Sequence, residues 1–99
     1  MAAINWTDRA DEEMAQIIEY WANQSENSAR LQIRRIFDKI EPLESFPRIG
    51  RIVPELDYPN VRELFAGPYR IIYHVVSDYR IDVLAIHHAS RPLDIDDLG

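Results

Sequence analysis

The chain has 99 residues, 46% of them hydrophobic and 10% aromatic, which suits one small domain with a single buried core. Its net charge of −6 argues against a domain that grips nucleic acid with its whole surface. Because cysteine is absent, disulfides, thiolate nucleophiles and cysteine-bound zinc are excluded. The apolar runs are far shorter than the roughly 18 residues of a membrane span. With no readable export signal, we expect a cytoplasmic protein without a membrane partner.

The first part of the chain predicts a strand followed by a helix. Residues 3–6 read as a short strand, and Thr7 or Asp8 then offers a side-chain oxygen that can cap the helix after it. The apolar residues of this helix recur with a helical period and should share one buried stripe. They are Ala10, Met14, Ile17, Ile18 and Trp21.

A second helix should follow a polar turn at residues 23–28, with Asn27 or Ser28 as its cap. Its inward residues are predicted to be Ala29, Ile33, Ile36, Phe37 and Ile40. Pro42 removes a helical hydrogen bond, so we expect a kink or break there before one last turn. The two helices then form an antiparallel hairpin.

The second half of the chain predicts a loop and then a sheet. Residues 47–60 contain three prolines and one glycine, which is typical of a loop. Residues 61–66, 69–76 and 80–88 read as three antiparallel strands joined by tight turns. The middle strand is apolar on both faces, and one face can rest on the helices. Either a partner binds the other face, or loops or a dimer mate cover it, and the sequence leaves both open.

Five short strings occur in an order that resembles the RelE/ParE family of toxins from bacterial type II toxin–antitoxin modules. They are Trp6-Thr7, SFPRIGR at 45–51, VREL at 61–64, GPYRIIY at 67–73 and IHHASR at 86–91. The resemblance implies an α+β fold of the order β-α-α-β-β-β, with residues 1–93 as one domain. Residues 94–99 are expected to form an acidic, flexible tail.

The family includes two activities, and the residues favour one of them. RelE-like members cut messenger RNA on the ribosome, whereas ParE-like members, the plasmid stabilisation type, poison DNA gyrase. Arg70 corresponds to a family arginine that binds the scissile phosphate. However, Val61 and Glu63 stand where the nucleases usually carry a base, with Arg62 directed to the opposite face. Ile95 stands where many nucleases place a tyrosine or histidine for proton transfer.

RNA cleavage by a 2′-hydroxyl needs a base, an acid and cations around the phosphate. Only a minimal set of Arg70, His88 and Arg91 is available for this chemistry. We therefore expect a ParE-like toxin that acts by binding rather than by catalysis. The alternatives are a ribosome-dependent endoribonuclease and a non-toxic family member that serves only as a binding module.

The residues expected to bind the target or the antitoxin are transferred from their family positions. They are Arg62, Tyr69, Arg70, Tyr73, His88 and Arg91. For three of these residues a structural role is the alternative. Arg70 can pair with Glu63 across the hairpin, and the two tyrosines can belong to the core. His87 and His88 should project from opposite faces of a strand, so we expect no metal site and no cofactor.

The resemblance also implies the partners. A cognate antitoxin should wrap the toxin with a C-terminal segment as helix and strand, and DNA gyrase should be the target. No direct contact with a specific nucleic-acid sequence is expected. A homodimer and a toxin–antitoxin heterotetramer both stay open.

Overall fold

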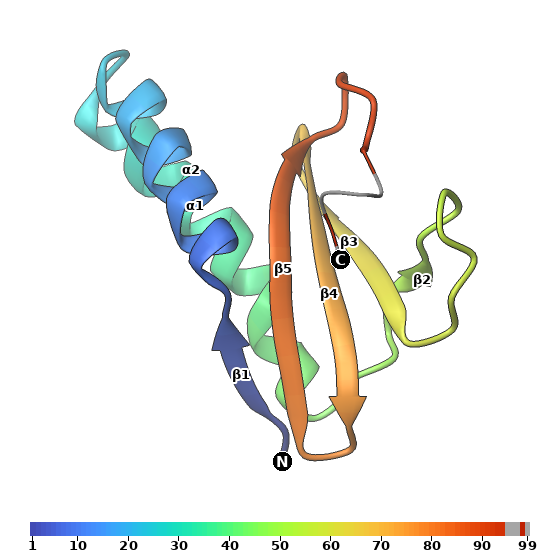
Figure 1. Cartoon of the computed structure of the whole chain (residues 1–99). Helices are drawn as coiled ribbons and strands as arrows, with labels where there is room; N and C mark the ends of the chain where they lie inside the picture. Colours follow the sequence, from blue (N-terminus) through green and yellow to red (C-terminus); the bar gives the residue numbers. More distant parts are fainter. Residues whose placement is uncertain (95–97, 99) are drawn as a thin grey trace.

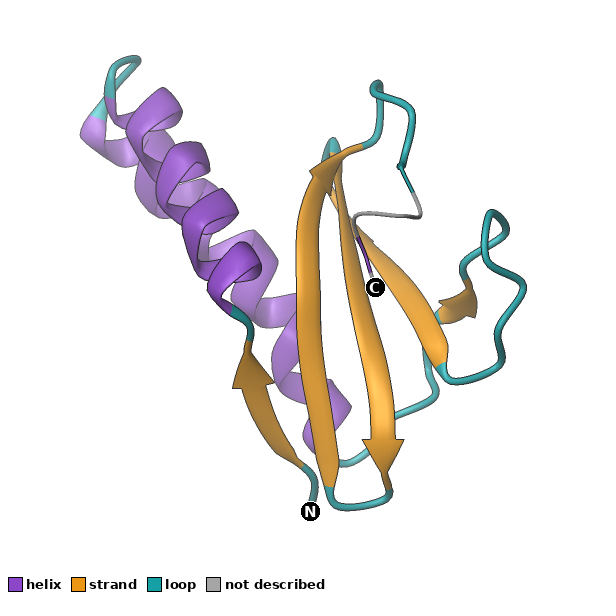
Figure 2. Cartoon of the chain, viewed as in Figure 1, coloured by secondary structure: helices purple, strands orange, loops and turns teal. Residues whose placement is uncertain are grey.

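The computed structural model describes residues 1–94 and Leu98 and has the expected α+β architecture (Figure 1). Its elements are β1 (Ala3–Trp6), α1 (Asp8–Ala22), α2 (Glu26–Ile40), the 3-10 helix η1 (Glu41–Glu44), β2 (Arg51–Ile52), β3 (Val61–Ala66), β4 (Tyr69–Ser77) and β5 (Arg80–His88). Figure 2 shows the two helices side by side along one side of the sheet. The predicted order of strand, helical hairpin and antiparallel meander is confirmed.

The sheet has the strand order β1-β5-β4-β3-β2, so the N-terminal strand lies beside the last strand of the chain. This pairing is parallel and runs from Ala3 opposite Arg80 to Trp6 opposite Val83. All other pairings are antiparallel. Because β1 ends at Trp6, it covers only the first half of the β5 edge. The second half of that edge, from Leu84 onward, faces helix α1.

The helix boundaries follow from their caps and from one proline. Thr7 caps α1 as expected, since its hydroxyl accepts from the Ala10 N–H at 3.2 Å. The cap of α2 is Ser25, which accepts from the Ser28 N–H at 3.0 Å, so the expectation of Asn27 or Ser28 is wrong. Helix α2 therefore begins earlier and places Glu26 in its first turn, where the helix dipole favours an acidic residue. Pro42 stands at the start of η1, in agreement with the predicted break.

The helices cover one face of the sheet with an apolar core that includes Met14, Ile36 and Ile71. Phe37 departs from the prediction, because it is 45% exposed and packs its ring 5.4 Å from that of Trp6 rather than pointing inward. Gln32 is buried instead, and its side-chain oxygen has no hydrogen-bond partner among the described residues. The helix thus buries a polar group where the periodicity predicted only apolar ones.

The second face of the sheet is covered by the chain itself. Buried residues on this face are Val53, Val61, Ile72 and Ala85. Packed against them are Leu56 of the loop before β3, Leu84 of β5, and Leu93 and Leu98 near the end of the chain. The contacts of Leu56 and Leu93 support the alternative in which loops cover this face.

Residues 47–60 contain one element that the sequence analysis missed. The two-residue strand β2 pairs with β3 through Arg51 opposite Glu63 and Ile52 opposite Arg62. The expectation of a loop throughout this segment is therefore wrong at these two positions. So short a strand has no alternation that a sequence pattern can reveal. None of the helices among the described residues is long and apolar enough to span a membrane.

Candidate functional site

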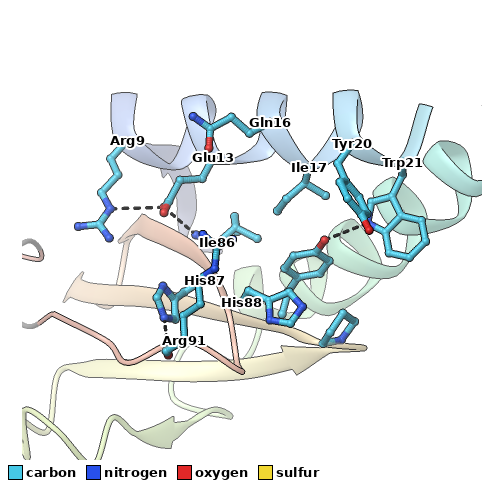
Figure 3. A pocket seen from close by; sticks show the side chains of 12 residues that line it. Arg9, Glu13, Gln16, Ile17, Tyr20, Trp21, Ile86, His87, His88 and Arg91 are labelled. Carbon is cyan, nitrogen blue, oxygen red and sulfur yellow. Dashed lines mark hydrogen bonds and ion pairs between the residues drawn. The ribbon is translucent and has the colours of Figure 1, made fainter. Parts of the chain in front are cut away.

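A pocket lies between α1 and the half of β5 that β1 leaves uncovered (Figure 3). We call it the α1–β5 pocket, and its volume is about 700 Å³. Helix α1 contributes Arg9, Glu13, Gln16, Ile17, Tyr20 and Trp21. The ends of β4 and β5 and the segments next to them contribute Pro68, Tyr69, Ile86, His87, His88 and Arg91.

One end of the pocket is aromatic. The indole Nε1 of Trp21 donates a hydrogen bond of 2.9 Å to the Tyr69 hydroxyl. The rings of Tyr69 and His88 meet edge to face, with their centroids 5.5 Å apart. Tyr20 packs its ring against Trp21 in the same manner, at 5.4 Å, and is itself 59% exposed. These contacts fix a partly apolar surface that suits an inserted apolar or aromatic side chain.

The side of the pocket is formed by the uncovered edge of β5. Here the Glu13 carboxylate accepts a hydrogen bond of 3.1 Å from the Ile86 backbone N–H (Figure 3). The same carboxylate oxygen lies 3.4 Å from Arg9 Nε. Glu13 thus takes the place of the carbonyl that a neighbouring strand would present to Ile86. An extended peptide that paired with this edge would have to replace Glu13 at the Ile86 N–H.

The turn after β5 gathers basic and imidazole groups at the mouth of the pocket. His87 Nε2 lies 2.9 Å from the Arg91 carbonyl oxygen, and the Arg91 N–H donates to the His88 carbonyl at 3.1 Å. His88 Nδ1 accepts from the Ser90 N–H at 3.2 Å. These bonds order the turn and hold the Arg91 backbone beside the two histidines. Among the described residues, no three potential metal ligands gather at one place.

A second group of charged residues lies on the opposite face of the sheet. We call it the Arg70 cluster, and it consists of Arg51, Glu55, Glu63 and Arg70. Arg70 Nε donates to Glu63 at 2.6 Å, while its two terminal nitrogens bind the two oxygens of Glu55 at 2.7 and 2.8 Å. Arg51 Nε donates to the other oxygen of Glu63 at 2.7 Å. The cluster thus joins three strands and the loop between β2 and β3.

Charge pairing favours the ionised forms of Glu55 and Arg70, against the opposing effect of burial. The Glu63 side chain is fully buried between the two arginines. Hydrogen bonds from Arg70 lower the pKa of Glu55 to about 2, and the positive charge of Arg51 acts in the same direction. The hydrogen bonds that Arg70 donates to Glu55 and Glu63 raise its own pKa above its usual value. Every nitrogen of the Arg70 guanidinium therefore already binds a carboxylate.

The structure gathers three of the six transferred residues in the α1–β5 pocket: Tyr69, His88 and Arg91. Tyr73 is fully buried in the core, where its hydroxyl accepts from the Gly50 N–H at 3.0 Å and burial raises its pKa. Arg62 donates to three backbone carbonyls of the neighbouring loops, those of Arg48, Gly50 and Pro59. These two side chains thus hold the fold together around the strands β2 to β4.

The residues of the nuclease alternative are not brought together. Arg70 pairs in register with His87, whereas His88 pairs with Tyr69, and neighbouring residues of a strand face opposite sides. Arg70 therefore lies on one face with the Arg70 cluster, and His88 lies on the other face beside Tyr69. The expected pairing of Arg70 with Glu63 is confirmed. Ile95, the position of the family's proton donor, lies outside the described residues.

The α1 side of the pocket was missed by the sequence analysis. Arg9, Glu13, Gln16 and Tyr20 recur at spacings of three and four along α1. Such a polar stripe beside the apolar one is visible in the sequence, but it is also what any solvent-exposed helix face shows. The stripe becomes part of a site only because β1 stops at Trp6 and leaves the β5 edge next to the stripe without a partner strand.

Comparison with known proteins supports the resemblance. A family model described as the ParE toxin of the type II toxin–antitoxin system parDE matches residues 4–93. The chain is 29% identical to Toxin RelE2 of Caulobacter vibrioides over 91 residues, which cover 92% of this chain and 99% of that protein.

A solved structure, the chromosomal ParDE toxin–antitoxin system from P. aeruginosa, shares the fold. Its chain matches with a TM-score of 0.72 at 22% identity, covering 89% of this chain and 96% of that one. Since the family model spans nearly the whole chain, the protein belongs to the ParE toxin family of type II toxin–antitoxin systems.

Proposed function

We propose that this toxin acts by docking to DNA gyrase rather than by cutting RNA. One observation carries the proposal: the Arg70 guanidinium binds Glu55 and Glu63 through all three nitrogens, on the sheet face opposite His88. Phosphodiester cleavage needs cations and proton carriers around one phosphate. Here the candidate cation is neutralised and the candidate proton carrier lies across the sheet.

We further propose that the α1–β5 pocket receives the antitoxin. Its aromatic end suits an inserted apolar side chain, and the uncovered edge of β5 suits an extended backbone. Arg91 and the two histidines at its mouth favour an acidic segment. These features together describe one extended, acidic peptide with an apolar or aromatic anchor residue.

The competing function is a ribosome-dependent endoribonuclease. The observation in its favour is that His87, rather than His88, is the cross-strand neighbour of Arg70. His87 Nε2 is engaged by the Arg91 carbonyl oxygen, and Arg70 is engaged by two carboxylates. In the described conformation neither group is directed to a shared ligand, so binding is the function with the stronger support.

The proposal is tested with purified toxin and purified gyrase. We expect the toxin to inhibit supercoiling of relaxed plasmid and its cognate antitoxin to relieve the inhibition. Unchanged supercoiling at a large excess of toxin would reject gyrase as the target. Toxin expression that never slows growth, with no antitoxin gene nearby, would instead support the non-toxic binding module.

Antitoxin binding at the α1–β5 pocket is tested by a matched pair of variants. Arg91→Gln removes a cation at the pocket mouth, whereas Arg80→Gln removes one at the other end of β5. We expect Arg91→Gln to raise the Kd for the antitoxin severalfold, without making the Kd depend more steeply on salt concentration. Arg80→Gln should leave the Kd unchanged. Equal effects of the two substitutions would place the antitoxin elsewhere.

A further inference from the structure

A second groove lies beside the outer edge of β1, and we call it the β1–α2 groove. It has a volume of about 310 Å³ and is lined by Ile4, Trp6, Phe37, Ile40, Glu41 and Glu44. Strand β1 stands at one end of the strand order, so no described strand pairs with its outer edge. The Phe37 ring packs on Trp6 and is still 45% exposed. The groove therefore presents an aromatic ring to solvent.

One side of α2 runs past this groove and changes charge along its length. Arg30, Arg34, Phe37 and Glu41 follow one another at spacings of four, three and four, which places them on the same side of the helix. We call these four residues the α2 row, and all of them are exposed. The row is basic before Phe37 and acidic after it, and Glu44 continues the acidic part into the groove.

The two charges nearest to Phe37 in the α2 row are not used within the chain. The side chains of Arg34 and Glu41 form no ion pair with any residue that the structure describes, whereas Arg30 binds Glu26 at 2.6 Å. Seven residues of helix separate Arg34 from Glu41 by about 10 Å along the axis. The row thus offers one cation and one carboxylate, on either side of an exposed ring, to a surface with the reverse order of charge.

The α2 row itself presents the reverse order when it is turned end for end. In an antiparallel pair of copies related by a two-fold axis, Arg34 of each copy faces Glu41 of the other, and the two Phe37 rings meet near the axis. Every contact in such an interface is made twice. A partner of uniform charge would instead be repelled by one half of the row. The charge order therefore selects a second copy of this chain as the occupant.

We propose that the α2 row and the β1–α2 groove form a homodimer interface. The Arg34–Glu41 ion pair is made twice across it, and the Phe37 ring of each copy packs against the groove of the other. Because the paired charges lie at the surface, the association is weak and is weakened further by salt. The interface shares no lining residue with the α1–β5 pocket, and the inference is independent of the proposed docking to gyrase.

The test is sedimentation equilibrium of the full chain from about 10 µM to about 1 mM, a range that detects a weak dimer. Arg34→Glu and Glu41→Arg each place like charges opposite one another, so we expect either substitution to raise the dimer Kd roughly tenfold or more. An equimolar mixture of the two variants has opposite charges at both contacts. The new carboxylate of one variant faces the new guanidinium of the other, and the unchanged Arg34 faces the unchanged Glu41. Mixing should therefore restore association to the wild-type level, which it could not do for misfolded variants.

Arg35→Glu is the matched control. It makes the same change in net charge as Arg34→Glu, but Arg35 lies on another side of α2, where its Nη1 is 3.9 Å from the position of a Cβ at Gly67. We expect this variant to dimerise like the wild type. A wild type that stays monomeric at the highest concentration, an equal loss in Arg35→Glu and Arg34→Glu, or a mixture that does not recover would each show the inference to be wrong. If Arg34→Glu self-associates normally but no longer binds the antitoxin, the row belongs to the antitoxin interface instead.

Discussion

The Glu55 carboxylate binds both terminal nitrogens of Arg70, and this contact ties an exposed loop to the centre of the sheet. The loop in turn places Val53 and Leu56 over the second apolar face. One charged contact therefore bears both on what Arg70 can bind and on how well that face is covered.

Stability should depend on pH through Glu55. Its folded pKa of about 2 lies below the ordinary 4.5, so its contribution is fully present above about pH 5 and is lost as pH falls towards 2. Because the side chain is one-third exposed, we expect Glu55→Gln to lower the free energy of unfolding at pH 7 by about 1 kcal/mol. The difference from the wild type should shrink in urea titrations between pH 5 and pH 2. A constant difference across that range would contradict the assignment.

Gly50 should be harder to replace than Gly67. A Cβ at this position would lie 2.5 Å from the Glu63 carbonyl oxygen and 2.7 Å from the Tyr73 hydroxyl. We expect Gly50→Ala to lower the free energy of unfolding by about 2–3 kcal/mol, because the buried strands must shift. Gly67→Ala is the comparison, since its Cβ has ample space and only its φ of 57° opposes it, at a cost of about 1 kcal/mol. Equal losses measured by thermal unfolding would refute the close contact at Gly50.

Removing the buried polar group of α2 should stabilise the protein. Gln32 is 5% exposed, and its side-chain oxygen has no hydrogen-bond partner among the residues described. We expect Gln32→Met, which has a similar volume, to raise the free energy of unfolding by about 1 kcal/mol. Gln16→Met on the exposed face of α1 should change it little. A loss of stability in Gln32→Met would show that the oxygen is hydrogen-bonded in solution.

The aromatic end of the α1–β5 pocket should contribute to antitoxin binding. Tyr20 is 59% exposed at the pocket, and Tyr79 is 76% exposed at the turn between β4 and β5. Both can be replaced by alanine with little effect on folding, since neither is buried. We expect Tyr20→Ala to raise the Kd for the antitoxin roughly tenfold and Tyr79→Ala to leave it unchanged, as measured by calorimetry. A larger rise in Kd for Tyr79→Ala than for Tyr20→Ala would place the interface at the other end of the sheet.

Much of the fold can be predicted from the sequence because its signals are local. Helical spacing from Ala10 to Trp21 and the turn residues between the long strands identify the hairpin and the meander. The parallel pairing of β1 with β5 joins residues about 77 positions apart, and no local pattern encodes it. Strand β2 is too short to show alternation, and Ser25 is one of several polar residues that can cap α2.

The site was harder to predict because its residues come together from distant parts of the chain. His87 and His88 could be assigned to opposite faces from alternation alone, and the pairing of Arg70 with Glu63 was a foreseeable alternative. Glu55 could not be assigned to Arg70, because nothing in a proline-containing loop fixes where its side chain points. The pocket side of α1 becomes visible only when the end of β1 is known.

The central claim is that this toxin harms by docking and not by cleaving RNA. The most direct test adds one preparation of purified toxin, in parallel, to gyrase with relaxed plasmid and to ribosomes carrying a defined message. We predict that supercoiling falls while primer extension finds the message intact. Cleavage of the message at the ribosomal A site, with supercoiling unaffected, would contradict the account.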